Sequence, residues 1–184
     1  AGFYVSLKQS QQALQTNPGI EGLFWPAPKQ LGDFSVVDQD GKPFGLNEIR
    51  NHWSFLFFGY THCPDVCQIT MSVMAEAYKQ MEQDNDNIQT VFVSVDPKRD
   101  SVDKMKQYVS YFDEDFIGLG GPIEQVMSLG SQIGVAYYHS KEDEKGYYTV
   151  DHTASIFLVD PRGRLVAKIS PPHEAGKIVE RFNT

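Results

Sequence analysis

An apolar run that leads directly into the chain's two cysteines constrains the fold more than any other part of this sequence. Residues 55–58 read Phe-Leu-Phe-Phe and have no polar face, which predicts a strand buried on both sides in a sheet covered by helices. Pro64 follows Cys63 and suits the first turn of a helix, where its missing N–H costs nothing. We therefore expect a helix from Pro64 to about Gln83, with Cys63 near its N-cap and Cys67 one turn further on.

The two cysteines are spaced so that they can react with one another or share a ligand. Residues four apart on a helix have Cα atoms roughly 6 Å apart, within the range of a disulfide. The helix dipole and the free N–H groups at a helix start favour a thiolate. Cys63 and Cys67 can therefore form a disulfide or hold a soft metal ion between two sulfurs. The remaining alternative is that both side chains merely pack in the core.

The helix that carries Cys67 is expected to bury an apolar face. Met71 and Met74 lie one and two turns beyond Cys67; methionine can ligate Cu(I), but this spacing favours core packing. Five residues share the expected buried face at helical spacing: Val66, Ile69, Val73, Ala77 and Met81.

The rest of the chain alternates strand and helix patterns. The order strand, helix, strand, helix, followed by a hairpin and a last helix, is a thioredoxin-like layout, and its first strands should run parallel. The sequence thus predicts an α/β, thioredoxin-like fold with a central mixed sheet flanked by helices, an N-terminal hairpin and an inserted hairpin. The expected strands are 34–37 with Phe44, 88–95, 116–119, 135–140 with 146–150, and 154–159 with 164–169; the further helices are 47–50, 101–112, 122–133 and 174–182.

The first thirty residues differ from the rest in composition. They carry Gln, Asn and three prolines, which predicts a lead-in segment, residues 1–30, that is helical over residues 6–15 and precedes a domain of residues 31–184. Phe24 and Trp25 are expected to dock on that domain. No stretch reaches the ~18 apolar residues that cross a bilayer. The chain begins at Ala1 without Met, and we expect it to follow a removed N-terminal membrane anchor.

The charge balance limits the partners. The 184 residues are enough for one domain with a sizeable core. There are 24 acidic and 16 basic side chains, and the net charge of −8 comes without a basic cluster, which argues against nucleic acid. Two cysteines do not fix the redox compartment. We expect a monomer.

Three blocks of the sequence together form a recognisable pattern. They read Tyr60-Thr61-His62-Cys63-Pro64-Asp65-Val66-Cys67, Phe92-Val93-Ser94-Val95-Asp96-Pro97-Lys98-Arg99-Asp100 and Val150-Asp151-His152-Thr153-Ala154. These blocks resemble the Sco/SenC family, thioredoxin-fold copper proteins associated with cytochrome c oxidase assembly. The blocks occur in the family's order within residues 33–182. Gln68 departs from the family, where many members have a second proline, but it touches no ligand position.

The resemblance implies a copper site made of Cys63, Cys67 and His152. Two sulfurs and one nitrogen are incomplete for structural zinc, which takes four closed ligands, but they serve Cu(I) through the sulfurs and Cu(II) with the imidazole added. A bound ion requires both thiols to be reduced. Thioredoxin enzymes usually place a cis-proline opposite their cysteines. Residues 151–155 contain none, so a histidine would take that place, which favours a metal binder over a redox enzyme.

Other polar residues near the motifs are weaker candidates. His62 adjoins Cys63 and is expected at a loop or rim. Asp65 either tunes the thiols or complements the helix N-terminus. Asp151 either orients His152, serves as a weak fourth ligand, or is a plain strand-edge carboxylate. The pair Asp96-Pro97 is expected to be structural, lining the site, and the surface or strand-edge histidines are expected to be His52, His139 and His173.

The resemblance implies a copper metallochaperone that passes its ion to the binuclear copper centre of a terminal oxidase. Its partners would be the copper-accepting oxidase subunit and a thiol reductant or copper donor, on the periplasmic or extracytoplasmic face of the inner membrane. The alternative is a thiol–disulfide oxidoreductase in which Cys63 attacks and Cys67 resolves. A third reading is a thiol peroxidase, because the fold overlaps that of peroxiredoxins. The two leading roles can coexist, since they use the same thiols.

Overall fold

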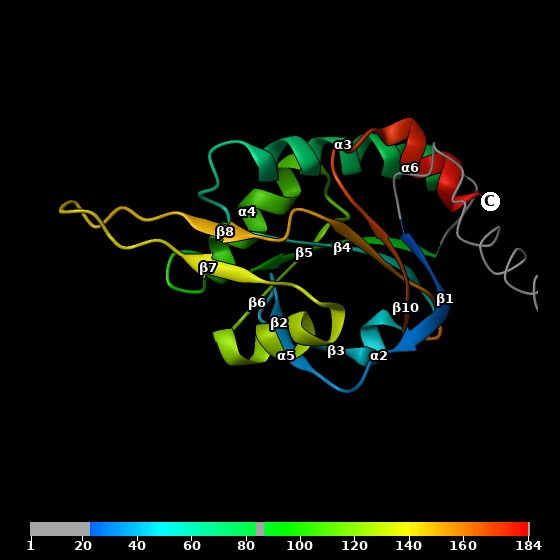
Figure 1. The fold of residues 1–184 in the computed structure, drawn as a ribbon, viewed down its shortest axis with the longest axis horizontal. Helices are drawn as coiled ribbons and strands as arrows, with labels where there is room; N and C mark the ends of the chain where they lie inside the picture. The colour runs from blue at the N-terminus through cyan, green and yellow to red at the C-terminus, as the bar shows by residue number, and fades with distance from the viewer. Residues whose placement is uncertain (1–22, 84–86, 184) are drawn as a thin grey trace, which may run out of the picture.

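The structure, a computed structural model, describes residues 23–83 and 87–183. Its main feature is an eight-stranded mixed sheet (Figure 1). In order across the sheet the strands are β1 (Leu23–Gln30), β10 (Arg164–Ile169), β9 (Ile156–Val159), β4 (Trp53–Gly59), β5 (Ile88–Ser94), β6 (Ile117–Gly120), β2 (Ser35–Asp38) and β3 (Pro43–Gly45).

Helices cover both faces of the sheet, so the molecule has three layers (Figure 1). The strands β4, β5 and β6 run parallel, and every other neighbouring pair is antiparallel. This arrangement confirms the predicted α/β, thioredoxin-like fold. One face carries α3 (Val66–Met81), α4 (Val102–Phe112) and α6 (Ala175–Phe182), and the other carries α2 (Leu46–Ile49) and α5 (Ile123–Ile133).

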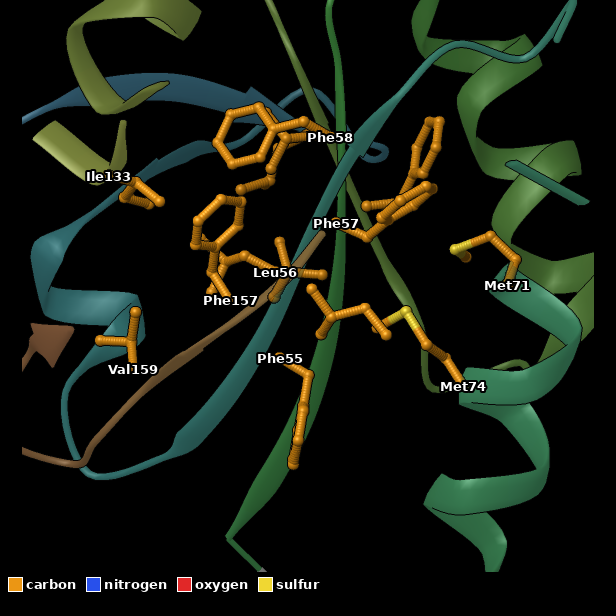
Figure 2. Close-up of a cluster of buried hydrophobic side chains, with 14 of the residues drawn as sticks. Phe55, Leu56, Phe57, Phe58, Met71, Met74, Ile133, Phe157 and Val159 are labelled. Atoms are coloured by element: carbon orange, nitrogen blue, oxygen red, sulfur yellow. The ribbon is translucent and has the colours of Figure 1, made fainter. Parts of the chain in front are cut away.

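The core is built around β4, as its unbroken apolar run predicts. Residues 55–58 are almost fully buried, and their side chains alternate between the two faces. The ring of Phe55 lies 5.6 Å from that of Phe182 in α6, whereas the ring of Phe58 lies 6.3 Å from that of Phe157 in β9. Figure 2 shows Met71 and Met74 of α3 on one side of β4 and Ile133 of α5 on the other. The predicted strand buried on both sides is confirmed.

The helix that carries Cys67 begins two residues later than predicted. Its N-cap is Asp65, whose backbone (φ −144°, ψ −75°) is not helical, so Pro64 and Cys63 lie in the loop before α3. The N–H of Cys63 donates to the carbonyl of Tyr60 at 3.2 Å, which closes that loop. Cys67 lies in the first turn of α3.

The predicted buried face of this helix is wrong at two positions. Val66 and Ile69 are 46% and 58% exposed. The side chains that pack on the sheet include Cys67, Met71 and Met74, so the two methionines are core residues as predicted.

The inserted hairpin is present, with a later second strand than predicted. β7 (Tyr137–His139) and β8 (Val150–His152) form a separate two-stranded sheet. The Asp143 carboxylate accepts the N–H groups of Lys145 and Tyr147, at 2.9 and 2.8 Å, so these residues form a turn rather than the start of the strand. His152 therefore lies within β8, paired with Tyr137.

The remaining predicted elements are present with ends shifted by one or two residues. The N-terminal hairpin is β2–β3, and the last hairpin is β9–β10. Ser101 caps α4 by accepting the Lys104 N–H at 3.3 Å, as predicted. The helix predicted over residues 6–15 lies outside the described residues, and the division into residues 1–30 and 31–184 stays a prediction; β1 pairs with β10 at one edge of the sheet. Among the described residues, no helix has the length and apolar character that would let it cross a membrane.

Candidate metal centre

Three side chains converge at one end of the sheet. The two sulfurs of Cys63 and Cys67 and one ring nitrogen of His152 all lie within 4.8 Å of one another. The Cys67 Sγ is 3.3 Å from the His152 Nε2. Within the described part of the chain, this is the one cluster of histidine, cysteine or acidic side chains with the spacing of a metal site. The structure thus brings together the three residues named from the sequence; their role as ligands stays a prediction at this point.

Sheet topology explains how residues 85 positions apart meet. Cys63 and Cys67 follow the end of β4, which pairs antiparallel with β9. In this register Phe57 faces Ile156, so the end of β4 lies beside the start of β9. His152 lies four residues before Ile156. Because antiparallel neighbours bring the end of one strand beside the start of the other, the imidazole reaches the cysteine loop.

The wall behind the sulfurs is apolar and close. A Cβ on Gly59 would lie 2.9 Å from the Cys67 Sγ and 2.9 Å from the Phe92 ring, so only glycine leaves room for the sulfur here. The rings of Phe57 and Tyr60 meet the imidazole of His152 edge to face, at centroid distances of 5.9 and 6.0 Å. The site is therefore a compact cradle for a small ligand.

The two thiols have opposite pKa shifts because they share a hydrogen bond. The Cys67 thiol donates a hydrogen bond to the Cys63 sulfur, and this bond is the largest cause that lowers the pKa of Cys63 to about 4. Burial opposes the shift, whereas hydrogen bonds from His152 and from the backbone N–H groups of Cys67 and Asp65 add to it. The same bond, together with burial, raises the pKa of Cys67 well above its usual range. At neutral pH the pair therefore holds one proton, as a Cys63 thiolate beside a Cys67 thiol.

The histidine turns one ring nitrogen toward the sulfurs. The His152 Nδ1 lies 3.2 Å from the Thr153 carbonyl oxygen, which can accept a hydrogen bond from a proton on Nδ1. The Nε2 faces Cys67 and is the nitrogen that can bind a metal ion. Two thiolate sulfurs and one neutral imidazole suit Cu(I), Cu(II) or Zn(II). The donor set fits an ion that keeps an open coordination position, and it falls short of the four closed ligands of structural zinc.

The weaker candidates lie outside this cluster. His62 is an exposed loop residue, as predicted, and its Nδ1 lies 3.1 Å from the Thr61 hydroxyl and 3.6 Å from Asp100. Asp65 is exposed and makes no side-chain cap hydrogen bond. Asp151 is exposed in β8, where neighbouring side chains point to opposite faces, so it points away from the face of His152. The other three histidines are half-buried and lie outside the cluster: His52, His139 and His173.

Sequence reasoning missed several residues that shape the site. Tyr60 opens the first block, with Gly59 directly before it, and Asp100 closes the second, so a signal for them was available. Tyr148 had none, since it contacts Asp96 from 52 positions away.

Comparison with known proteins agrees with this geometry. A family model described as SCO1/SenC matches residues 26–184. The mitochondrial SCO2 homologue of Mus musculus is 36% identical over 151 residues, which make up 81% of this chain and 59% of that protein. The chain thus spans less than two thirds of this relative.

Two solved structures share the fold. The crystal structure of Arabidopsis thaliana ScoI with copper bound has a TM-score of 0.77 and 31% identity, covering 82% of this chain and 94% of that one. The solution structures of apo Sco1 from Thermus thermophilus have a TM-score of 0.80 and 35% identity, covering 89% of this chain and 95% of that one. The resemblance drawn from the three sequence blocks is confirmed: the chain belongs to the SCO1/SenC family.

Proposed function

We propose that the chain binds one copper ion through Cys63, Cys67 and His152 and delivers it to the copper centre of a cytochrome c oxidase during assembly. The observation that carries this proposal is the convergence of two sulfurs and one imidazole nitrogen within 4.8 Å. The copper in the related Arabidopsis thaliana structure supports the choice of ion. Copper here is cargo that the chain carries to an acceptor.

The donor set suits transfer as well as binding. Three protein ligands leave the ion room for a ligand from an acceptor, so ligands can be exchanged one at a time. The Cys63 sulfur is already a thiolate at neutral pH, since its pKa lies at about 4, and only the Cys67 proton must leave on binding. The acceptor would be the copper-binding subunit of the oxidase, and a thiol reductant or copper donor would supply the reduced, loaded form.

The site is placed outside the cytoplasm in this proposal. A SCO1/SenC family lipoprotein from Bacillus anthracis has a known structure that is 25% identical to this chain, with a TM-score of 0.73. Its description as a lipoprotein supports a membrane-associated, extracytoplasmic location. An N-terminal anchor and a monomeric state are part of the same proposal.

A thiol–disulfide oxidoreductase is the second candidate, and the low pKa of Cys63 favours it. The Cys63 thiolate would attack a disulfide of the oxidase or of another extracytoplasmic protein and release one thiol. The buried Cys67 would then displace the second thiol, leaving the target reduced and a Cys63–Cys67 disulfide in this chain. No bond to His152 forms or breaks in this reaction.

Mutants of the three residues separate the two candidates. The reduced protein should bind one copper per chain, and Cys63→Ser or Cys67→Ser should each abolish tight binding. In the Cu(II) form, His152→Ala should weaken or shift the sulfur-to-copper absorption band, whereas His52→Ala, at a histidine outside the cluster, should leave it unchanged. A disulfide-reduction assay on the same variants tests the alternative. Copper binding that is indifferent to His152, together with rapid disulfide reduction, would replace the chaperone with the oxidoreductase.

A further inference from the structure

The ribbon that carries His152 is not part of the main sheet. In the described part of the chain, β7 and β8 pair only with each other, and Figure 1 shows the ribbon and its connecting loop projecting from the body. Past β8, the Thr153 N–H donates to the Ala136 carbonyl at 3.0 Å, which ties the two strands together at their base. Ladder hydrogen bonds therefore do not fix the ribbon relative to the cysteines, and side-chain contacts must do so.

One turn, residues 96–100, lies between the cysteine loop and the ribbon. The N–H groups of Arg99 and Asp100 both donate to the Asp96 carbonyl, at 3.1 and 3.0 Å. The Ser94 hydroxyl donates to the Asp100 carboxylate at 2.6 Å and accepts the Asp96 N–H at 3.1 Å. Both carboxylates are buried. The turn is thus held rigid, with its two acidic side chains at fixed positions.

Asp100 binds the cysteine loop. Its carboxylate accepts the Thr61 N–H at 3.0 Å and the Thr61 hydroxyl at 2.6 Å. Thr61 lies two residues before Cys63. A buried carboxylate that accepts three hydrogen bonds is a strong anchor, since each bond to a charged group outweighs a neutral one.

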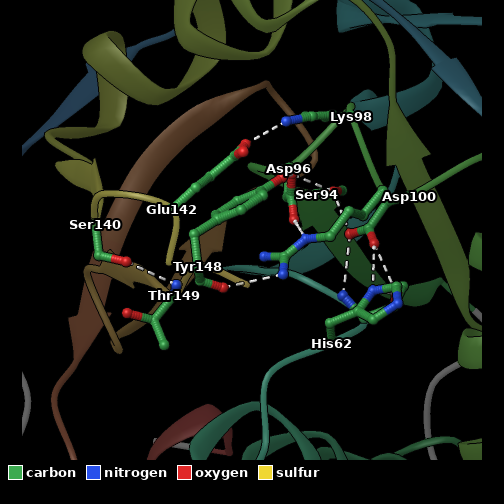
Figure 3. Close-up of polar contacts among 11 residues, drawn as sticks. His62, Ser94, Asp96, Lys98, Asp100, Ser140, Glu142, Tyr148 and Thr149 are labelled. Carbon is green, nitrogen blue, oxygen red and sulfur yellow. Dashed lines mark hydrogen bonds and ion pairs between the residues drawn. The ribbon is translucent and has the colours of Figure 1, made fainter. Parts of the chain in front are cut away.

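Asp96 and Arg99 bind the ribbon, and Figure 3 shows Asp96 beside Tyr148. The Tyr148 hydroxyl donates to the Asp96 carboxylate at 2.6 Å in a buried contact. The Arg99 guanidinium bonds Asp96, donates to the Tyr148 carbonyl at 3.0 Å, and stacks over the Tyr148 ring at 3.6 Å. Tyr148 lies two residues before β8 and four before His152. Arg99 also lies 5.4 Å from the ring of Tyr60, which itself contacts His152.

We propose that residues 96–100 form a clamp that sets the distance between the two halves of the site, with Asp100 positioning the cysteine loop and Asp96 and Arg99 positioning the histidine ribbon through Tyr148. These are positioning residues, because they act on the ligands through Thr61 and Tyr148. As far as copper is concerned, the inference rests on the proposed function.

The two arms of the clamp predict different effects on copper. Tyr148→Phe keeps the ring under Arg99 but removes the bond to Asp96, so the imidazole should be held less well. We expect the Cu(II) affinity to fall about tenfold and the sulfur-to-copper band to shift. Losing a group that orients a metal ligand typically costs about 10- to 100-fold in affinity, so this loss is at the lower end of that range. The Cu(I) affinity, which rests on the two sulfurs, should change much less. Asp100→Asn loosens the cysteine loop and should weaken both oxidation states.

Matched controls make the same chemical changes elsewhere. Tyr138→Phe removes the hydroxyl of an exposed tyrosine on the same ribbon, and Asp103→Asn neutralises an exposed carboxylate in the first turn of α4. Both should leave copper affinity and the absorption band unchanged. Equal losses of Cu(I) and Cu(II) affinity in Tyr148→Phe, or a wild-type band in that variant, would overturn the clamp. Thr61→Val, which removes the 2.6 Å hydroxyl bond to Asp100 together with the 3.1 Å contact to His62, replaces Asp100→Asn if that variant does not fold.

A copper-free measurement keeps this inference separate from the proposed function. Amide hydrogen exchange in the metal-free, reduced protein should be faster at residues 150–152 in Tyr148→Phe than in the wild type or in Tyr138→Phe. If the wild type binds no copper but exchange at these residues still rises, the proposed function fails and the clamp stands. If exchange at residues 150–152 does not change, the clamp is wrong whatever copper does.

Discussion

At Cys63 the position of one proton decides the chemistry. The thiol of Cys67 keeps its proton and donates a hydrogen bond to the Cys63 sulfur, so Cys63 is the thiolate and Cys67 the thiol. Cys67 is fully buried, whereas Cys63 keeps 7% of its surface exposed. The charged, more accessible sulfur is therefore the one that meets a metal ion or a disulfide first, in either of the candidate functions.

The shifted pKa of Cys63 predicts an unusual pH profile for thiol alkylation. For a thiol of ordinary pKa 9.0, the thiolate fraction rises about tenfold with each unit of increasing pH as long as the pH stays below the pKa. The reaction rate of such a thiol therefore climbs steadily from pH 6 to pH 8. Cys63, with a pKa of about 4, is already ionised over that range, so its rate with iodoacetamide should be nearly flat. Mass mapping of the alkylated residue over pH 3–9 measures this, and Cys63→Ser should leave only slow labelling at buried Cys67. A rate that climbs tenfold per unit through pH 7 would contradict the shared proton.

On the scale of one element, α3 shows how a site can override an apolar pattern. Two stripes at helical spacing overlap on this helix, one through Val66 and Ile69 and one through Cys67, Met71 and Met74. Only one can face the sheet, and the stripe with Cys67 does. Placing the sulfur beside Gly59 turns Ile69 toward solvent.

This choice of face predicts unequal effects of two similar truncations. Met71→Ala removes a fully buried side chain and should lower the free energy of unfolding by about 2–5 kcal/mol. Ile69→Ala removes an exposed one on the same helix and should change it by less than about 0.5 kcal/mol. Urea unfolding of the reduced, metal-free proteins gives both values. A larger loss for Ile69→Ala than for Met71→Ala would mean that the helix is rotated from its place in this structure.

The strands show what local sequence can and cannot predict. The apolar run of β4 predicts a buried strand, and the sequence of β9 and β10 predicts a hairpin; the structure contains both. The register of β8 depends on the Asp143 turn, a side-chain contact that the hairpin pattern does not reveal. His152 was named only through the resemblance, because nothing in its neighbourhood indicates which loop it will face. The Tyr148–Asp96 contact depends on tertiary packing and had no sequence signal at all.

On the scale of the whole molecule, the site joins two segments that the sheet alone does not hold together. The cysteines belong to the loop and helix after β4, whereas His152 belongs to a ribbon outside the main sheet. An ion bound by all three residues would link these segments across 85 positions of the chain. Because the unfolded chain cannot preorganise such a site, the binding energy adds to the stability of the fold.

Copper should therefore raise the melting temperature of the reduced protein, and His152 should contribute to the rise. At free Cu(II) about a thousandfold above the dissociation constant, binding stabilises the native state by about 4 kcal/mol. For a chain of this size that corresponds to an increase of about 8–16 °C in Tm. His152→Ala should lose a large part of the increase and Cys63→Ser nearly all of it, as measured by thermal unfolding followed by circular dichroism. A chelator should reverse the shift, which separates bound metal from a disulfide formed by oxidation, since a disulfide would persist. An equal, reversible shift in wild type and Cys63→Ser would place the copper elsewhere on the molecule.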